Sequence, residues 1–472
     1  MTAVVDLGAS TITGTIDPTD ATIHRFLGIR YARAERFAVP ELVEPRGAIT
    51  ATAFGPAAPQ LPAAGMVPGD VTPATMSEDC LFLNVWAPST PGPHPVFVWF
   101  HGGGFLGGTT SDPTIDGARL AARGPLVVVS VAYRVGALGF LGLDATNVGL
   151  RDQLAALQWI ARHIEGFGGD PVNVTVAGES AGGGSVLHLL AAPASTGLVR
   201  RAIVQSGATD YTRTRAEVDR VTEVFVGALD GEDPRTCTWE QIIAAQGASL
   251  FPLMTEMARM PFHPCVDGDL IHDRPAAALA AGLAADIDLL IGTTEDEMRL
   301  FLMEAELADA QMRTRVDRYL GRDGAEVVAA YQSLVGDDPM DVWAAIFSDR
   351  EMQLPAIAVA DAHRGATYRY LFTWPVARRA DGLPLRACHA ADLPFPFDAL
   401  DRLDWAAWTA AADDRVAADA LVEAMAGSWC RFAASGDPGW APHASGDVFE
   451  FGRSCRVRPD PLAARRAIWT AG

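Results

Sequence analysis

The sequence predicts an α/β protein with a mostly parallel central sheet, flanked by helices and extended by helical cap excursions. The first observation is a series of short apolar runs rich in β-branched residues, which are typical of strands buried on both faces. The second is that helix-like stretches separate these runs, an alternation that favours parallel strands. The third is a pair of longer helix-rich stretches, at about 208–287 and 298–365, that interrupt the alternation.

Each predicted element rests on its own pattern. The predicted strands are Pro95–Phe100, Leu126–Tyr133, Asn173–Gly178, Arg201–Gly207, Asp288–Glu295 and Ala366–Trp374. Residues Gly149–Ile164 repeat apolar side chains at helical spacing, and a second helix is expected from Ser180 towards Leu190. The two excursions are expected to cap a site at the carboxyl ends of the strands, where open α/β sheets bind ligands.

Composition excludes several classes of protein. The 472 residues, 49% of them hydrophobic, contain no linker or repeat, so we expect one enlarged α/β domain over residues 1–472. The net charge of -21 and the lack of an arginine-rich block argue against nucleic-acid binding. No apolar run is long enough to span a bilayer, and the N-terminal residues do not resemble a signal peptide.

The cysteines predict neither a zinc site nor a disulfide framework, because none has Cys-x-x-Cys spacing. They are Cys80, Cys237, Cys265, Cys388, Cys430 and Cys455. Free thiols are the norm in a reducing cytosol, so a cytoplasmic location is expected.

A lone serine stands where a strand changes into a helix. The stretch "VTVAGESAGG" places Ser180 in a Gly-x-Ser-x-Gly pattern between β-branched residues and small ones. Gly178 and Gly182 lack Cβ atoms, so strand and helix can approach closely and lift the hydroxyl out of the sheet. The backbone N–H of Ala181 would then face a developing negative charge. The pattern predicts a nucleophile, and the alternative is an ordinary turn serine.

A glycine-rich loop follows the first predicted buried strand. In "FHGGGF", Phe100–Phe105, three consecutive glycines cost backbone entropy, so a specific conformation must require them. One interpretation is that the N–H groups of Gly103 and Gly104 point at an oxyanion, and the other is a plain turn at the end of the strand. Its position upstream of Ser180 favours the first interpretation.

A nucleophilic serine needs a base, and His389 is the expected one among ten histidines. It opens "HAADLPFPF" after the strand at Ala366–Trp374, and with this serine pattern the base comes last in chain order. His101 belongs to the glycine loop and His188 to the helix after the serine, so structural roles are expected for both.

The base in turn needs an orienting acid, which should follow a strand between Ser180 and His389. Three adjacent carboxylates follow the strand "DLLIG": Glu295, Asp296 and Glu297. The residues alone leave the choice among them open.

Long stretches over nearly the whole chain resemble the type-B carboxylesterases, the cholinesterase-like and para-nitrobenzyl-esterase-like branch of the α/β-hydrolases. The stretches are "FLGIRYA" (Phe26–Ala32), "SEDCLFLNVWAP" (Ser77–Pro88), "HGGGF", "YRVGALGFL" (Tyr133–Leu141), "NVGLRDQLAALQWI" (Asn147–Ile160), "GGDPVNVTVAGESAGG" (Gly168–Gly183), "RAIVQSG", "PCVDGDLI", "GTTEDE", "HAADLPFPF" and "FAASGDP" (Phe432–Pro438). The resemblance implies an α/β-hydrolase fold.

The resemblance also implies the site. It implies a catalytic triad of Ser180, Glu297 and His389. It implies an oxyanion hole formed by the N–H groups of Gly103, Gly104 and Ala181. Two further residues match family positions next to the triad, Glu179 and Ser206, and are expected to support it.

The sequence departs from the family pattern in three places. Met298 follows the acid where the family has glycine. Cys80 matches a cysteine that is disulfide-bonded in animal members, but no cysteine precedes it here, which is consistent with an intracellular bacterial enzyme. The stretch Met66–Thr75 lacks the tryptophan that holds choline in cholinesterases, so choline esters are not expected as substrates.

The predicted function is that of a cytoplasmic serine carboxylesterase that acts on small to medium apolar esters through an acyl-enzyme. No cofactor or metal is expected, and no nucleic-acid or membrane partner. A monomer or small homo-oligomer is expected. One alternative is an aryl carbamate or amide hydrolase on the same triad. Another is a non-catalytic cholinesterase-like binding module.

Three methionines at spacings of three, Met254, Met257 and Met260, precede "PCVDG". They are expected either to form the buried face of a helix or to line the pocket for the acyl or alcohol group. Methionine side chains are flexible and suit varied apolar groups.

Overall fold

The computed structural model describes residues 2–61, 71–207, 211–257, 259–403, 414–443 and 446–470. Over those residues the centre of the molecule is a sheet of 13 strands. In its parallel part, the strands lie in the spatial order β9 (Val127–Val131), β8 (His94–Phe100), β10 (Gly169–Glu179), β11 (Arg201–Gln205), β14 (Asp288–Thr294), β15 (Thr367–Phe372) and β18 (Asp447–Phe451). Each neighbouring pair in this series is parallel. The first six match the predicted strands, and the predicted parallel centre is confirmed.

All but one of the strand pairs at the edges of the sheet are antiparallel, which makes the whole sheet mixed. The edge strands are β1 (Thr2–Asp6), β2 (Ser10–Ile16), β3 (Ile23–Arg30), β7 (Phe82–Pro88) and β19 (Arg456–Pro459), with β6 (Gly47–Thr50) beside β2. Three short pairs lie outside the sheet: β4 (Ala32–Arg33) with β5 (Glu41–Leu42), β12 (Arg213–Thr214) with β13 (Cys265–Val266), and β16 (Val376–Arg378) with β17 (Pro384–Arg386). The β16–β17 hairpin lies between β15 and His389 in the chain.

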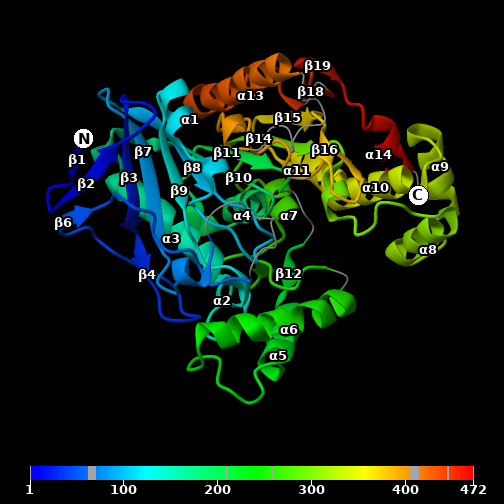
Figure 1. Ribbon diagram of the computed structural model, residues 1–472, viewed down its shortest axis with the longest axis horizontal. Coiled ribbons are helices and arrows are strands. Elements are labelled where there is room, and N and C mark those ends of the chain that lie inside the picture. Colours follow the sequence, from blue (N-terminus) through cyan, green and yellow to red (C-terminus); the bar gives the residue numbers. More distant parts are fainter. Residues whose placement is uncertain are drawn as a thin grey trace.

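Helices cover both faces of the sheet. Those next to it are α1 (Ala118–Arg123), α2 (Gly136–Phe140), α3 (Val148–His163), α4 (Ala181–Leu190), α7 (Pro275–Ala280), α11 (Leu354–Ala362) and α13 (Arg415–Ser435). A lower lobe in Figure 1 contains α5 (Arg215–Gly227) and α6 (Trp239–Met257). A lobe at the right contains α8 (Asp309–Leu320), α9 (Ala325–Val335), α10 (Pro339–Ser348) and α14 (Ala463–Thr470).

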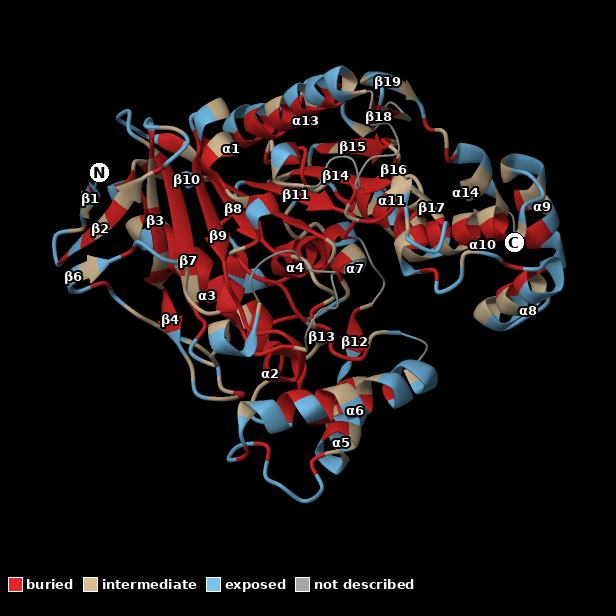
Figure 2. Ribbon diagram, viewed as in Figure 1, coloured by how far each residue is buried: buried red, intermediate tan, exposed pale blue. Residues whose placement is uncertain are grey.

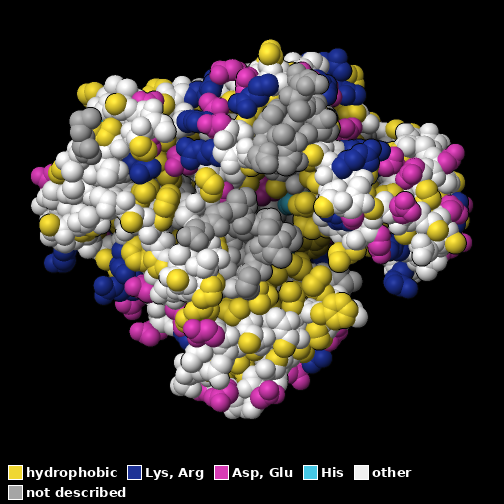
Figure 3. Space-filling view, in the orientation of Figure 1, with side chains coloured by type: hydrophobic (Ala, Val, Ile, Leu, Met, Phe, Trp, Pro, Cys, Tyr) yellow, Lys and Arg dark blue, Asp and Glu magenta, His cyan; other side chains and the backbone are white. Residues whose placement is uncertain are grey.

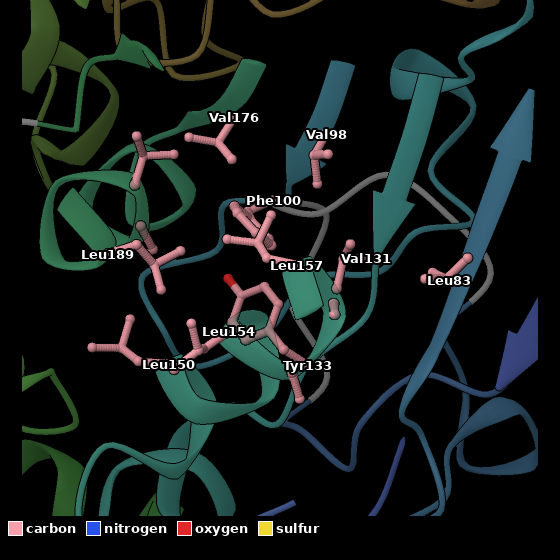
Figure 4. Close-up of a cluster of buried hydrophobic side chains, with 14 of the residues drawn as sticks. Leu83, Val98, Phe100, Val131, Tyr133, Leu150, Leu154, Leu157, Val176 and Leu189 are labelled. Atoms are coloured by element: carbon pink, nitrogen blue, oxygen red, sulfur yellow. The ribbon is translucent and has the colours of Figure 1, made fainter. Parts of the chain in front are cut away.

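Alternate residues of the central strands enter two separate cores, as expected for strands covered on both faces. In β8, Val96, Val98 and Phe100 belong to one buried cluster, while Phe97 and Trp99 belong to the other. Figure 4 shows part of the first cluster, where side chains from β7, β8, β9 and β10 meet those from α3 and α4. Figure 2 shows the strands at the centre of the sheet almost wholly buried and the outer faces of α13, α5 and α6 exposed.

Two further observations concern the cysteines and the helices. All six cysteines are free. Among the described residues, none of the helices has both the length and the hydropathy needed to cross a bilayer.

Candidate active site

The serine lies at a sharp turn between β10 and α4. Ser180 has a φ of 55°, an unusual value for a residue with a side chain, so the turn stores strain. A Cβ on Gly182 would lie 2.0 Å from the carbonyl oxygen of Phe100, and a Cβ on Gly178 would lie 2.4 Å from the carbonyl carbon of Gly182. Only glycine allows this approach of strand, helix and neighbouring strand.

The glycine loop lies directly against this turn. A Cβ on Gly102 would lie 3.3 Å from the Cβ of Ser180. Gly103 and Gly104 both have positive φ, 115° and 63°, and the carbonyl of Gly103 accepts the N–H of Leu106 at 3.0 Å. These conformations account for the glycines that the sequence places here.

Three backbone N–H groups near Ser180 have no acceptor in the part of the chain that the structure describes. They belong to Gly103, Gly104 and Ala181, the first residue of α4. The start of a helix carries partial positive charge, and free amides there bind anions. Free backbone amides of this kind are able to donate hydrogen bonds to a negative oxygen.

The histidine and one of the three acids meet in a buried contact. Nδ1 of His389 lies 2.6 Å from Oε2 of Glu297, and the other carboxylate oxygen, Oε1, accepts the N–H of Thr294 at 2.8 Å. Glu297 is fully buried and His389 is 5% exposed. The side chain of Asp296 instead accepts a hydrogen bond from Arg299 at 3.0 Å. Of the three adjacent carboxylates, Glu297 is therefore the one whose side chain contacts the His389 ring.

Met298 leaves the conformation of the acid intact. Glu297 begins the short 3-10 helix η5 (Glu297–Phe301), a conformation in which Met298 needs no positive φ. The N–H of Met298 donates to Oγ of Ser348 at 3.0 Å. The departure from the family pattern at this position does not displace the carboxylate.

The other ring nitrogen of His389 faces a second carboxylate. Nε2 lies 3.2 Å from Oε1 of Glu179, and has no hydrogen-bond partner among the described residues. Burial of the imidazole disfavours its charged form, but the carboxylates of Glu179 and Glu297 outweigh burial and raise the pKa of His389. Burial also raises the pKa of Glu179, an effect that His389 partly offsets.

Ser206 lies behind the site. It follows β11, has a φ of 46°, and donates its N–H to the carbonyl of Gly292 at 2.9 Å. Its hydroxyl is buried without a hydrogen-bond partner among the described residues. No hydrogen bond between described residues joins it to Ser180, Glu297 or His389.

The structural roles expected for two other histidines agree with their contacts. His101 stacks on Tyr133 with ring centroids 4.4 Å apart, and its Nδ1 lies 2.9 Å from the carbonyl oxygen of Gly102. In α4, Nδ1 of His188 lies 2.7 Å from the carbonyl oxygen of Gly184. Burial lowers the pKa of both rings to about 4.

Two residues near His389 were not assigned roles by the sequence. The ring of Phe301 lies 5.3 Å from the imidazole, centroid to centroid, and is 38% exposed, so it lines the approach to the histidine. Asp392 is fully buried and accepts the hydroxyl of Tyr370 at 2.9 Å. Burial raises the pKa of Asp392 to about 6. The sequence does contain a signal for Phe301, because this residue is an aromatic side chain four positions after Glu297.

The three methionines separate in the structure. Met254 lies on α6 and is 38% exposed, and Met257 is the last residue of that helix. Met260 lies beyond the helix, with its Cε 3.8 Å from the position of a Cβ on Gly104. The expectation of one buried helix face is wrong for Met254 and Met260. Met260 instead borders the glycine loop.

One face of the molecule is hollowed. Figure 3 shows a hollow between the lobe of α5 and α6 and the lobe of α8–α10, with hydrophobic side chains gathered on the side of α6. In the described part of the chain, no group of three or more His, Cys, Asp or Glu side chains is arranged to hold a metal ion. Residues 66–70, half of the stretch Met66–Thr75 that lacks the choline-binding tryptophan, lie outside the described residues.

Comparisons with known proteins agree with this arrangement. Residues 1–446 match the family model described as the carboxylesterase family. The para-nitrobenzyl esterase of Bacillus subtilis (strain 168) is 35% identical over 447 residues, which cover 89% of this chain and 88% of the relative. A solved carboxylesterase of Geobacillus stearothermophilus has a TM-score of 0.85 at 30% identity, with 99% of each chain covered. A thermophilic para-nitrobenzyl esterase has a TM-score of 0.84 at 30% identity, covering 98% of this chain and 99% of the other.

These relatives favour ester hydrolysis over the carbamate, amide and binding-module alternatives. They also confirm the α/β-hydrolase fold predicted from the sequence. The chain therefore belongs to the carboxylesterase family, and it is a carboxylic ester hydrolase that works through a serine.

Proposed function

We propose that Ser180 is the nucleophile of this esterase, that His389 is its general base and that Glu297 orients the histidine. The observation that carries the proposal is the 2.6 Å contact between Nδ1 of His389 and Oε2 of Glu297. It fixes the imidazole so that the unpartnered Nε2 remains to take a proton. The strained conformation of Ser180 supports its role, and so does its position directly after Glu179, whose carboxylate lies 3.2 Å from His389.

In the proposed first half-reaction, Oγ of Ser180 attacks the ester carbonyl carbon while its proton passes to Nε2 of His389. The carbonyl oxygen becomes negative and accepts hydrogen bonds from the N–H groups of Gly103, Gly104 and Ala181. When the tetrahedral intermediate collapses, the bond to the alcohol oxygen breaks. The imidazolium returns its proton to that oxygen, and the acyl group stays on Ser180.

The second half-reaction repeats these steps with water. His389 takes a proton from water, and the resulting hydroxide attacks the acyl carbon. The same three N–H groups stabilise the second oxyanion. Collapse breaks the bond to Oγ, His389 returns the proton to Ser180, and the carboxylic acid leaves.

For substrates, we propose small to medium apolar esters, including esters of aromatic alcohols. Apolar side chains near the reacting groups support this: Met260 borders the glycine loop and Phe301 lies against His389. One relative is named a para-nitrobenzyl esterase, which points to the same class. Long-chain lipids and choline esters are proposed as poor substrates.

The test compares kcat/KM for an aryl ester and an anilide that share one acyl group, and for an aryl carbamate that has the same aryloxide leaving group as the ester. Hydrolysis of the ester should be fastest, because phenoxide leaves more readily than anilide and because nitrogen donation makes a carbamate carbonyl less electrophilic than an ester carbonyl. A single organophosphate adduct on Ser180, mapped by peptide mass spectrometry, is expected alongside. A carbamate optimum, or an adduct elsewhere, would contradict the proposal.

A cytoplasmic location in a bacterium is proposed as well. Six free cysteines, five of them buried, support a reducing compartment. Thiol titration after anaerobic purification tests this, and six titrating thiols in the unfolded protein are expected. A disulfide at Cys80 would contradict it.

A further inference from the structure

Two loops bring the proposed acid and base together, and backbone hydrogen bonds join them. We name residues 295–301 the acid loop and residues 384–392 the histidine loop. The N–H of Asp296 donates to the carbonyl of Ala387 at 2.9 Å, and the N–H of His389 donates to the carbonyl of Glu297 at 3.0 Å. These two bonds place the loops side by side. They act on one side of each loop only, so other contacts must fix the opposite side.

A closed ring of four charged side chains holds that far side. In the acid loop, Arg299 donates to Oδ1 of Asp296 at 3.0 Å and also to Oδ1 of Asp341. In the histidine loop, Arg386 donates to Oδ2 of Asp341 at 2.6 Å, and its other terminal nitrogen lies 3.7 Å from Oδ1 of Asp296. Asp341 therefore accepts hydrogen bonds from one arginine of each loop.

The helix α10 carries Asp341 near its start and makes a second tie at its end. Ser348, the last residue of α10, accepts the N–H of Met298 at 3.0 Å. Both contacts reach the acid loop within two residues of Glu297. One helix thus fixes the conformation of the acid loop from both sides.

The ring of four side chains fixes the positions of the two loops more than it stabilises the folded protein. Burial alone would raise the pKa of Asp341, but its hydrogen bonds to Arg299 and Arg386 outweigh burial and lower it, so the carboxylate stays charged. The four side chains border a polar cavity of about 280 Å³. Ion pairs of this kind contribute little net stability, because removing charges from water costs about as much as the pairing returns. Their directional hydrogen bonds, in contrast, fix geometry.

We propose that Asp341 is a positioning residue that sets the distance between Glu297 and His389 by holding both loops. The inference rests on the triad proposed above. Asp341 touches neither the substrate nor the reacting atoms, and acts through Arg299 and Arg386. Without its charge, Asp296 is the one carboxylate of the ring left between the two arginines, and their mutual repulsion loosens the tie between the loops. A displacement of roughly 1 Å can cost about a hundredfold in rate.

Asp341→Asn tests this, because asparagine keeps the shape and removes the charge. The matched control is Asp460→Asn. Asp460 also joins two arginines, at 3.1 Å to Arg369 and 2.9 Å to Arg466, but it contacts neither loop. Organophosphate titration counts the active serines in each preparation, so that kcat is expressed per competent site.

The expected result for Asp341→Asn is a loss of about tenfold to a hundredfold in kcat per site, with KM within about twofold of wild type. The acid limb of the pH profile should move to lower pH, since a looser Glu297 raises the pKa of His389 less. The downfield Nδ1–H resonance of His389 should broaden or move upfield. Asp460→Asn should lower the melting temperature without any of these changes.

Unchanged kcat per site and an unchanged pH profile in Asp341→Asn would overturn the inference. The inference would also be overturned if Asp341→Asn behaved like the control, with fewer active serines in the preparation but a normal kcat for each of them. If Asp341→Asn does not fold, Ser348→Ala takes its place. The expected result is a smaller loss of kcat per site and a shift of the acid limb in the same direction. An unaltered kcat per site and pH profile in Ser348→Ala would also overturn the inference. A wild-type enzyme that is not labelled at Ser180 would instead refute the proposed triad.

Discussion

The imidazole of His389 lies between two carboxylates, with Nδ1 2.6 Å from Oε2 of Glu297 and Nε2 3.2 Å from Oε1 of Glu179. The two contacts have different consequences. Glu297 fixes the orientation of the ring, whereas Glu179 lies on the side where the proposed proton transfer takes place. The protonation behaviour of the base therefore depends on both residues, and each can be tested separately.

Ser180→Ala should lower kcat by roughly four orders of magnitude or more, because the covalent step is lost. KM for a soluble aryl ester should change little. Steady-state kinetics and the loss of organophosphate labelling measure the effect. Ser206→Ala serves as a control, because the described contacts do not join its hydroxyl to the triad. Activity in Ser180→Ala within tenfold of wild type would refute the nucleophile.

Glu297→Gln should lower kcat by about 10³- to 10⁴-fold, because an amide cannot stabilise the imidazolium and can favour the wrong tautomer. Asp296→Asn keeps the contact between Glu297 and His389, so a much smaller loss is expected. Both substitutions preserve side-chain shape, and circular dichroism checks the fold. A larger loss of kcat in Asp296→Asn than in Glu297→Gln would show that Glu297 is the wrong choice for the orienting acid.

The pH dependence should report the raised pKa of His389. Neutral imidazole is the active form, so kcat/KM should fall on the acid side with a midpoint above the ordinary histidine pKa of 6.5. Glu179→Gln removes one of the carboxylates that raise this pKa, so the acid limb should move to lower pH.

The control for this shift is Glu165→Gln, a surface change in the chain segment before β10. It alters the net charge equally without facing the imidazole. The profile of Glu165→Gln should match that of wild type. An acid limb that does not move in Glu179→Gln would mean that this carboxylate does not act on the base.

Met260→Ala should change the preference for acyl or alcohol chain length, because Met260 borders the glycine loop. One methylene in an apolar pocket changes discrimination by about tenfold or more, so longer groups should gain relative to shorter ones. Met254→Ala is the matched control, since that side chain is exposed on α6. Profiles of kcat/KM against chain length provide the measurement. Identical profiles for the two variants would remove Met260 from the pocket.

Local patterns were sufficient to predict the centre of the fold. The strand, tight turn and helix around Ser180 could be predicted because Gly178 and Gly182 both allow the strand and the helix to approach closely. The parallel strands were readable because strands buried on both faces leave long apolar runs. The antiparallel edge, β1–β3 and β7, was not predicted. In β1 and β2, exposed polar residues interrupt the apolar pattern. β7 is buried along most of its length, but it was noted only as part of a family resemblance.

Contacts between distant segments could not be read from the sequence. Choosing Glu297 over its two neighbours requires the position of His389, 92 residues later. The ring through Asp341 joins three separate segments, and a lone aspartate on a helix carries no local signal of such a role. The methionine spacing was misleading, since α6 ends at Met257 and Met260 follows in irregular structure.

The division of the site between two parts of the chain has a consequence for evolution. The serine and the three free amides come from residues 103–181, whose conformation is set by strands and glycines. The proposed acid and base come from later loops that contact α10, a helix of the right-hand lobe. Insertions or substitutions in that lobe can therefore tune turnover while the nucleophile stays intact. Divergence in this enzyme can proceed through one half of its machinery at a time.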